Sequence, residues 1–231
     1  MRQVFTNLYN HRFEIFLLSQ VLILFGSLIF PGEFYEEVIL PIFFLFNLIT
    51  GMLLISKKKK LLWILIFQFV ILAFLSGGNM IQRGNESEGL GQFRLIIYFI
   101  FYIVVTWNII RQVWNEKTVD KKVILGLMSG YISLGFLAFF LFMSIEIWTP
   151  GSFQGVLLNE ELDIRMQTDS IMYYAYITLL TIGYGEIIPV TPVAQKAAVL
   201  VGLIGQFYIV IITAVVVEKY IRHLSQQKLN Q

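Results

Sequence analysis

The chain has 231 residues, of which 57% are hydrophobic and only 14% are charged, and its formal net charge is +2. This composition supplies too little polar surface for a soluble globule, so a membrane is the expected solvent. The near-neutral charge disfavours nucleic acid as a partner, and the absence of cysteine excludes disulfides and thiolate metal sites.

Six apolar segments are long enough to cross a bilayer, which takes about 20 apolar residues as a helix. The first begins near basic residues, as a signal peptide does, but Pro31-Gly32-Glu33 follows it without a small-residue cleavage pattern, so we interpret it as a retained helix. The sequence therefore predicts an all-α membrane protein with six transmembrane helices. In chain order they cover about 13–30, 38–56, 61–78, 93–110, 123–148 and 192–220.

The positive charges predict the orientation, because lysine and arginine gather in cytosolic loops. With the N-terminus in the cytosol, most of them fall on the inner side, and both termini of this multi-pass chain are cytosolic in the plasma membrane. Lys57, Lys58, Lys59 and Lys60 lie at the inner end of the second segment. There they would attract anionic lipid headgroups by about 1 kcal/mol each, or would serve only to fix the topology.

Between the fifth and sixth segments lies a helix that is too short to span. Thr168, Asp169 and Ser170 supply N-cap chemistry, and residues 170–180 read as a helix of about three turns. At 1.5 Å per residue this helix covers about 17 Å, whereas the hydrocarbon core is about 30 Å thick. The segment must therefore enter the membrane and turn back, which is permitted where protein or water surrounds the non-helical backbone.

The turn that follows has the residue types needed to surround a bare cation with backbone oxygens. Gly183 and Gly185 lack a Cβ and can adopt positive φ, so left- and right-handed residues can alternate and aim successive carbonyls toward one axis. The hydroxyl of Thr181 adds another oxygen, the ligand atom that hard cations prefer. Tyr184 would point away and brace the loop. An ordinary glycine-rich turn is the alternative, but this turn lies between two long apolar segments and leads into an acid.

The stretch resembles the pore signature of the tetrameric potassium channel superfamily, Thr-x-x-Thr-[Val/Ile]-Gly-Tyr-Gly-Asp. The resemblance covers about 123–220 and is most specific over 178–186. It implies that the bound ion is K⁺, that Thr181 also coordinates it through its hydroxyl, and that a homotetramer surrounds it. The carbonyls implied as ligands belong to Thr181, Ile182, Gly183 and Tyr184.

The same resemblance implies a supporting shell around the filter. Thr178 matches the pore-helix threonine, and Gly185 completes the filter. Tyr173 and Tyr174 stand where the family often has two aromatics that hold the filter tyrosine, although ordinary helix packing would also explain them. Glu186 replaces the usual aspartate, and its extra methylene retains the attraction for cations while changing the geometry of the family's aromatic-to-carboxylate bond.

Beyond the filter, Pro189 and Pro192 keep the return segment out of a regular helix. Thr191 is the expected N-cap of the sixth helix, with Pro192 at its first position. Gly205 lies where the family has a gating hinge in the pore-lining helix, and close helix packing is an equally good interpretation.

The fourth segment does not carry the charge pattern of a voltage sensor. Counting in threes from Arg94 gives only isoleucine and threonine, whereas a sensor needs several arginines or lysines at that spacing. We therefore predict a non-sensing four-helix domain over 1–112 and a pore domain over 113–231.

The function predicted is passive, potassium-selective conduction through a homotetrameric pore. A non-selective cation channel of the same fold and a potassium uptake transporter subunit are the alternatives. An enzyme is not expected, because the sequence offers no catalytic or metal-ligand cluster, and His11 and His223 lie near the ends of the chain.

Overall fold

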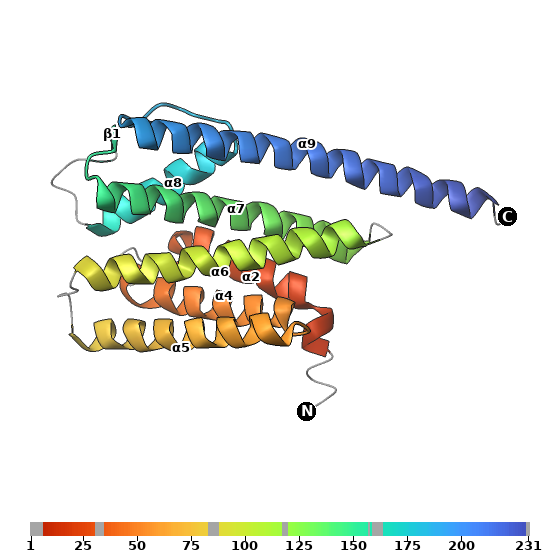
Figure 1. Ribbon diagram of the computed structural model, residues 1–231, viewed down its shortest axis with the longest axis horizontal. Coiled ribbons are helices and arrows are strands. Elements are labelled where there is room, and N and C mark those ends of the chain that lie inside the picture. Colours follow the sequence, from red (N-terminus) through yellow and green to blue (C-terminus); the bar gives the residue numbers. More distant parts are fainter. Residues whose placement is uncertain are drawn as a thin grey trace. The chain divides into compact units, whose positions relative to one another are not determined.

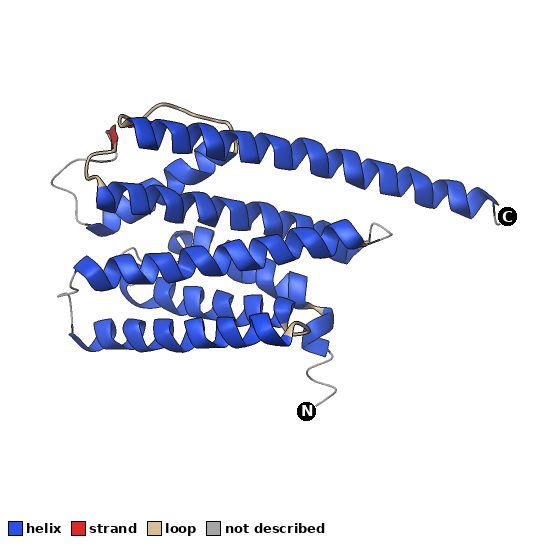
Figure 2. Cartoon of the chain, in the orientation of Figure 1, coloured by secondary structure: helices blue, strands red, loops and turns tan. Residues whose placement is uncertain are grey.

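A computed structural model of the chain describes residues 7–30, 35–82, 88–116, 120–156, 158 and 164–229. Helices make up most of these residues (Figure 2). The chain divides into two compact units, Met1–Ile109 and Ile110–Gln231. The division lies within a continuous helix, three residues before the boundary predicted from the sequence.

Unit 1 is a group of helices that lie side by side (Figure 1). Each α-helix is mostly apolar with a few polar residues, and the helix that ends in Asn115 continues into unit 2. The elements are α2 (Arg12–Phe25), the 3-10 turn η1 (Gly26–Leu28), the π-helical turn η2 (Tyr35–Ile39), α4 (Leu40–Ile55), α5 (Lys59–Gln82) and α6 (Glu88–Asn115).

The first helix is shorter than predicted because Tyr35 terminates it. Its hydroxyl donates to the carbonyl oxygens of Leu22 at 3.1 Å and Ile23 at 2.5 Å, in the last turn of the helix, where carbonyls begin to lack helical partners. Its ring also lies so close to Gly26 that a Cβ there would be 2.5 Å from it. The α-helix therefore ends at Phe25, and the prediction that it continues to residue 30 was wrong.

Buried polar side chains connect three helices of unit 1. The hydroxyl of Tyr102 on α6 donates to Asn47 Oδ1 on α4 at 2.8 Å, and Asn47 Nδ2 donates to Ser19 Oγ on α2 at 2.8 Å. Ser19 also lies 3.1 Å from Thr50 Oγ1. Such bonds contribute about 0.6 kcal/mol each inside membranes. This network ties α6 to its neighbours through uncharged groups.

Unit 2 contains the predicted pore region. Its first helix is capped by Asp120, whose Oδ1 accepts from the Val123 N–H at 2.9 Å. The short helix α8 lies between the two long helices α7 and α9 (Figure 1). The elements are α7 (Lys121–Trp148), β1 (Phe153–Gly155), α8 (Ile164–Leu179), β2 (Ile187–Pro189) and α9 (Pro192–Leu229).

Helix α8 begins earlier than the sequence indicated. It starts at Ile164, so Thr168, Asp169 and Ser170 lie inside it and the predicted N-cap was wrong. The reason is that 164–169 contains no glycine or proline to stop a helix from extending toward its N-terminus. With 16 residues α8 is about 24 Å long, still less than a bilayer core of about 30 Å.

The start of α9 confirms the prediction for this junction. Thr191 Oγ1 accepts from the Ala194 N–H at 3.3 Å, and Pro192 is the first helical residue. Near the other end, Lys219 Nζ donates to the carbonyl oxygens of Trp114 at 3.0 Å and Glu116 at 2.5 Å, at the C-terminus of α6. A cation at that position also complements the helix dipole.

Among the described residues, three helices are long and apolar enough to cross a membrane: Gly89–Asn115, Lys121–Trp148 and Pro192–Lys219. Leu40–Ile55 is apolar but shorter. The six predicted segments thus correspond to helices, of which these three meet the length and composition of a span.

Candidate functional site

Helix α8 is held against α7 by an aromatic side chain set into a glycine notch. The ring of Tyr176 occupies the space that a Cβ on Gly135 would need. Its hydroxyl donates to the Ile132 carbonyl oxygen at 2.8 Å, and Phe136 meets the ring edge to face with centroids 5.9 Å apart. Because any larger residue at position 135 would push α8 away, this notch sets the distance between α8 and α7.

The C-terminal end of α8 is enclosed by both long helices. Gly205 of α9 packs on the Leu179 carbonyl so closely that a Cβ there would overlap the oxygen. Tyr131 of α7 donates a hydrogen bond to the same oxygen at 3.2 Å. The ring of Tyr208 lies 5.4 Å from that of Tyr131, and its hydroxyl donates to the Leu127 carbonyl oxygen at 2.7 Å. These contacts fix the point at which the chain leaves α8.

After α8 the backbone alternates in hand. Thr181 has φ 57°, Gly183 has φ 58° and Gly185 has φ 91°, while Ile182 and Tyr184 between them have negative φ. In such an alternating segment, successive peptide carbonyls of a nearly extended chain can face the same side, whereas in a regular strand they point alternately to opposite sides. The structure thus places the two glycines at left-handed positions, as the sequence predicted.

The left-handed conformation of Thr181 was not predicted. A β-branched residue with φ near +57° is a true outlier, and it is the one positive-φ residue other than glycine that the structure describes. Such strain costs about 1–3 kcal/mol and tends to persist at functional sites. The Thr181 N–H donates to the Thr178 carbonyl oxygen at 3.0 Å, which helps to hold the strained turn.

A side-chain bond braces the two ends of this turn. The hydroxyl of Tyr173 on α8 donates to Glu186 Oε1, just beyond the filter. This hydrogen bond to a carboxylate raises the pKa of Tyr173 to about 12, with smaller contributions from burial and from the negative charge itself. The longer glutamate side chain therefore still reaches the tyrosine donor.

Tyr174 faces a different set of neighbours. It is buried among the rings of Phe142 and Phe153, with centroids 5.2 Å and 5.3 Å away, and its oxygen is hydrogen-bonded by the hydroxyl of Thr178. Neither Tyr173 nor Tyr174 makes a ring contact with Tyr184 in the described part of a single chain, and Tyr184 is 74% exposed. Within one chain, Tyr173 and Tyr174 therefore do not cover the ring of Tyr184.

A small antiparallel ribbon supports the return segment, and no sequence signal indicated it. Strand β1 pairs with β2 so that Phe153 opposes Pro189 and Gly155 opposes Ile187. A Cβ on Gly155 would overlap the Glu186 carbonyl oxygen, and the Val156 N–H donates to that oxygen at 3.1 Å. Two strands of three residues have no alternation pattern long enough to detect, and only the glycine hints at the close approach.

The loop that carries β1 is itself anchored to the end of α7. The carboxylate of Glu146 accepts from the Gly151 N–H at 2.7 Å and from the Phe153 N–H at 3.0 Å. Ser152 then links to the return segment, since its carbonyl oxygen accepts from the Val190 N–H at 2.9 Å and its hydroxyl lies 3.1 Å from that of Thr191. A continuous chain of bonds thus runs from α7 through the ribbon to the filter exit.

The arrangement suits coordination by main-chain oxygens rather than by a metal-binding side-chain cluster. Among the described residues, no group of three or more histidine, aspartate and glutamate side chains could hold a metal ion. Thr181, Ile182, Gly183, Tyr184 and Gly185 are all exposed in one chain.

Comparison with known proteins identifies the class of this region. A family model described as ion channel matches residues 131–222, which runs from the middle of α7 into α9 and includes the braced turn. Searches of the curated proteins and of the solved structures found no significant match. The family match and the long apolar helices support an ion channel in a membrane, with the likeness to the potassium-channel superfamily confined to unit 2.

Proposed function

We propose that four copies of this chain form a potassium-selective channel that conducts passively across the plasma membrane. The carrying observation is the alternating backbone at Thr181, Gly183 and Gly185, which matches what a carbonyl-lined filter requires. In this proposal the carbonyls of residues 181–184 replace the water around K⁺, which is the cargo of the reaction.

Two observations support an oligomer around the filter. Only 11% of the apolar stretch of α9 that is long enough to cross a membrane is buried within one chain, compared with 56% for α7. Residues 181–185 are exposed in one chain, and a single strand cannot surround an ion. In the tetramer, neighbouring copies cover the apolar surface of α9 and the exposed ring of Tyr184.

Potassium selectivity is favoured over a non-selective pore by the braced turn. Tyr184 is retained in the filter, and the Tyr173–Glu186 bond closes the turn behind it. We further propose that unit 1 does not sense voltage. Positions 97, 100, 103, 106 and 109 on α6 are uncharged, and α6 is tied to α4 through the neutral pair Tyr102 and Asn47.

The test is a potassium flux assay on the purified chain in liposomes, with barium as a pore blocker. Gly183→Ala should abolish flux, because a Cβ at φ 58° costs about 1–2 kcal/mol in each copy and turns a carbonyl off the axis. Gly151→Ala is the matched control, since Gly151 also has positive φ with no atom near its missing Cβ, but lies in the outer loop. Potassium flux that survives Gly183→Ala would overturn the proposal.

A further inference from the structure

Four consecutive lysines, Lys57 to Lys60, run from the short link after α4 into the first turn of α5, and all four are exposed. None forms an ion pair with a carboxylate among the described residues. The ammonium group of Lys58 donates a hydrogen bond to Asn108 Oδ1 of α6, which is a neutral acceptor. No described carboxylate therefore forms an ion pair with these four lysines.

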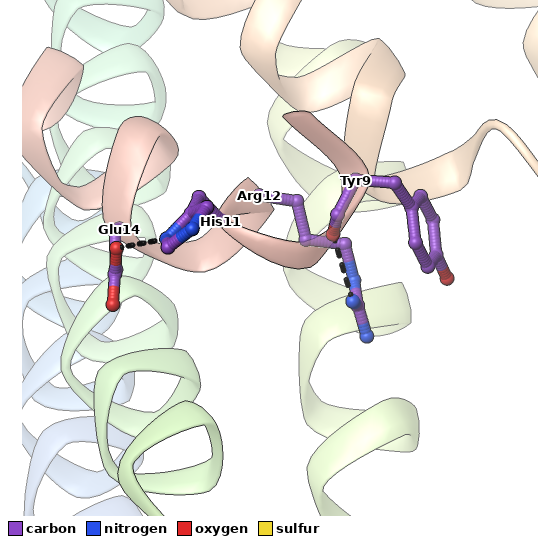
Figure 3. Close-up of polar contacts among 4 residues, drawn as sticks. All are labelled: Tyr9, His11, Arg12 and Glu14. Carbon is purple, nitrogen blue, oxygen red and sulfur yellow. Dashed lines mark hydrogen bonds and ion pairs between the residues drawn. The ribbon is translucent and has the colours of Figure 1, made fainter. Parts of the chain in front are cut away.

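The ring of Tyr9 contacts two cationic side chains at this end of unit 1. The Arg12 guanidinium carbon lies 4.2 Å from the centroid of the Tyr9 ring, and Lys57 Nζ lies 4.6 Å from the same centroid. Arg12 is held further by a hydrogen bond from Nη1 to the Tyr9 carbonyl oxygen at 3.0 Å (Figure 3). The two charges come from segments 45 residues apart in sequence, and each cation–π contact contributes about 0.5–1 kcal/mol.

Glu14 is the acid closest to Arg12 in sequence, and it contacts His11. Glu14 Oε2 lies 2.6 Å from His11 Nδ1, one turn along α2 (Figure 3). Arg12 and Lys57 are thus positioned together by the ring of Tyr9. Helix α5 then begins at Lys59 with no acid in its first turn, so its positive end adds to the field of the lysines.

Exposed apolar side chains follow the four lysines along α5. Trp63, Phe67 and Phe74 are 72%, 67% and 82% exposed, and they follow the lysines at intervals of one or two turns. A surface with cations at one end and large apolar groups beyond them matches the two parts of a phospholipid, the phosphate and the acyl chains. A free phosphate would use only the first part.

We propose that the exposed lysines Lys57, Lys59 and Lys60, of which Lys57 shares the ring of Tyr9 with Arg12, form a binding site for the phosphodiester headgroup of an anionic membrane lipid, with its acyl chains along Trp63 and Phe67 of α5. We call Tyr9, Arg12, Lys57, Lys59 and Lys60 the Tyr9 basic cluster. The lipid phosphate supplies a negative partner for the three lysines, which form no ion pair with a described carboxylate. The site belongs to unit 1 and does not depend on conduction through the pore.

The experiment measures lipid binding to the full-length channel by native mass spectrometry, with phosphatidylglycerol as the probe and phosphatidylcholine as the neutral reference. Lys57→Gln/Lys59→Gln should weaken phosphatidylglycerol binding about 25-fold, which converts from about 1 kcal/mol per lysine near a lipid surface. Lys121→Gln/Lys122→Gln removes two exposed lysines at the start of α7 and should leave the affinity within about twofold. Millimolar inorganic phosphate should not displace the lipid.

Tyr9→Leu provides a second variant that keeps every lysine. Loss of both cation–π contacts should weaken binding about two- to fivefold per contact. The proposal is overturned if the lysine pair and its control lose affinity equally, if neither Lys57→Gln/Lys59→Gln nor Tyr9→Leu changes it, or if inorganic phosphate competes with the lipid. If the lysine double variant fails to assemble, Tyr9→Leu and phosphate competition decide the matter.

Discussion

At the scale of single residues, the contact between Tyr173 and Glu186 is the clearest local feature of the proposed filter. It joins the middle of α8 to the residue that follows Gly185, so it spans the strained turn from one end to the other. Because the donor is a phenol and the acceptor a carboxylate, the bond depends on Tyr173 remaining protonated.

This dependence predicts a shifted titration. The pKa of Tyr173 is raised from 10.0 to about 12 by the bond to Glu186, so the stabilising contact is fully present below about pH 10 and is lost as pH rises through about 12. The tyrosinate absorbance of the wild type minus that of Tyr173→Phe should therefore titrate near pH 12. In a Glu186→Gln background the same difference should move toward 10. A midpoint near 10 in both backgrounds would show that the bond is absent in solution.

At the scale of elements, the ribbon of β1 and β2 holds in place the segment that follows residues 181–185. Gly155→Ala should disrupt it, because the added Cβ would overlap the Glu186 backbone oxygen on the paired strand. We expect a lower melting temperature of the assembly and reduced potassium flux, with Gly151→Ala affecting neither as strongly. Unchanged flux in Gly155→Ala would mean that the ribbon does not position the filter.

Helix α9 offers a matched pair of glycines that separates packing from hinge motion. Gly205→Ala should destabilise the channel by displacing α9 from the Leu179 carbonyl, whereas Gly202→Ala meets only the Thr178 oxygen at 3.9 Å and should gain about 1 kcal/mol of helix propensity. Thermal unfolding of the two variants measures the difference. Equal stability of both variants would contradict the packing role of Gly205 and leave the hinge interpretation.

The sequence predicted the parts of this region that have a repeating or local chemical signal. The long apolar helices, the cap at Thr191 and the glycines at positive φ follow from hydropathy, hydroxyl placement and the missing Cβ. The early end of α2 was missed because Tyr35, thirteen residues beyond Leu22, reaches back to its carbonyls. The ribbon at Gly155 was missed for a similar reason, since its pairing joins residues more than thirty positions apart.

At the scale of the whole molecule, α9 presents more apolar surface than one chain can cover. Phe207 on α9 is 58% exposed and Phe74 on α5 is 82% exposed, and the proposal assigns the first to a subunit interface and the second to lipid. Phe207→Gln should therefore reduce the tetramer fraction measured by native mass spectrometry, and Phe74→Gln should not. Equal effects of the two variants would remove this argument for assembly through α9.

The central claim is that the turn from Thr181 to Gly185 selects potassium. The most direct test is the reversal potential of the purified channel in a planar bilayer with potassium on one side and sodium on the other. Selective coordination by the filter carbonyls predicts a reversal potential close to the potassium equilibrium potential. A reversal potential near zero would contradict the claim, because the pore would then pass both ions equally.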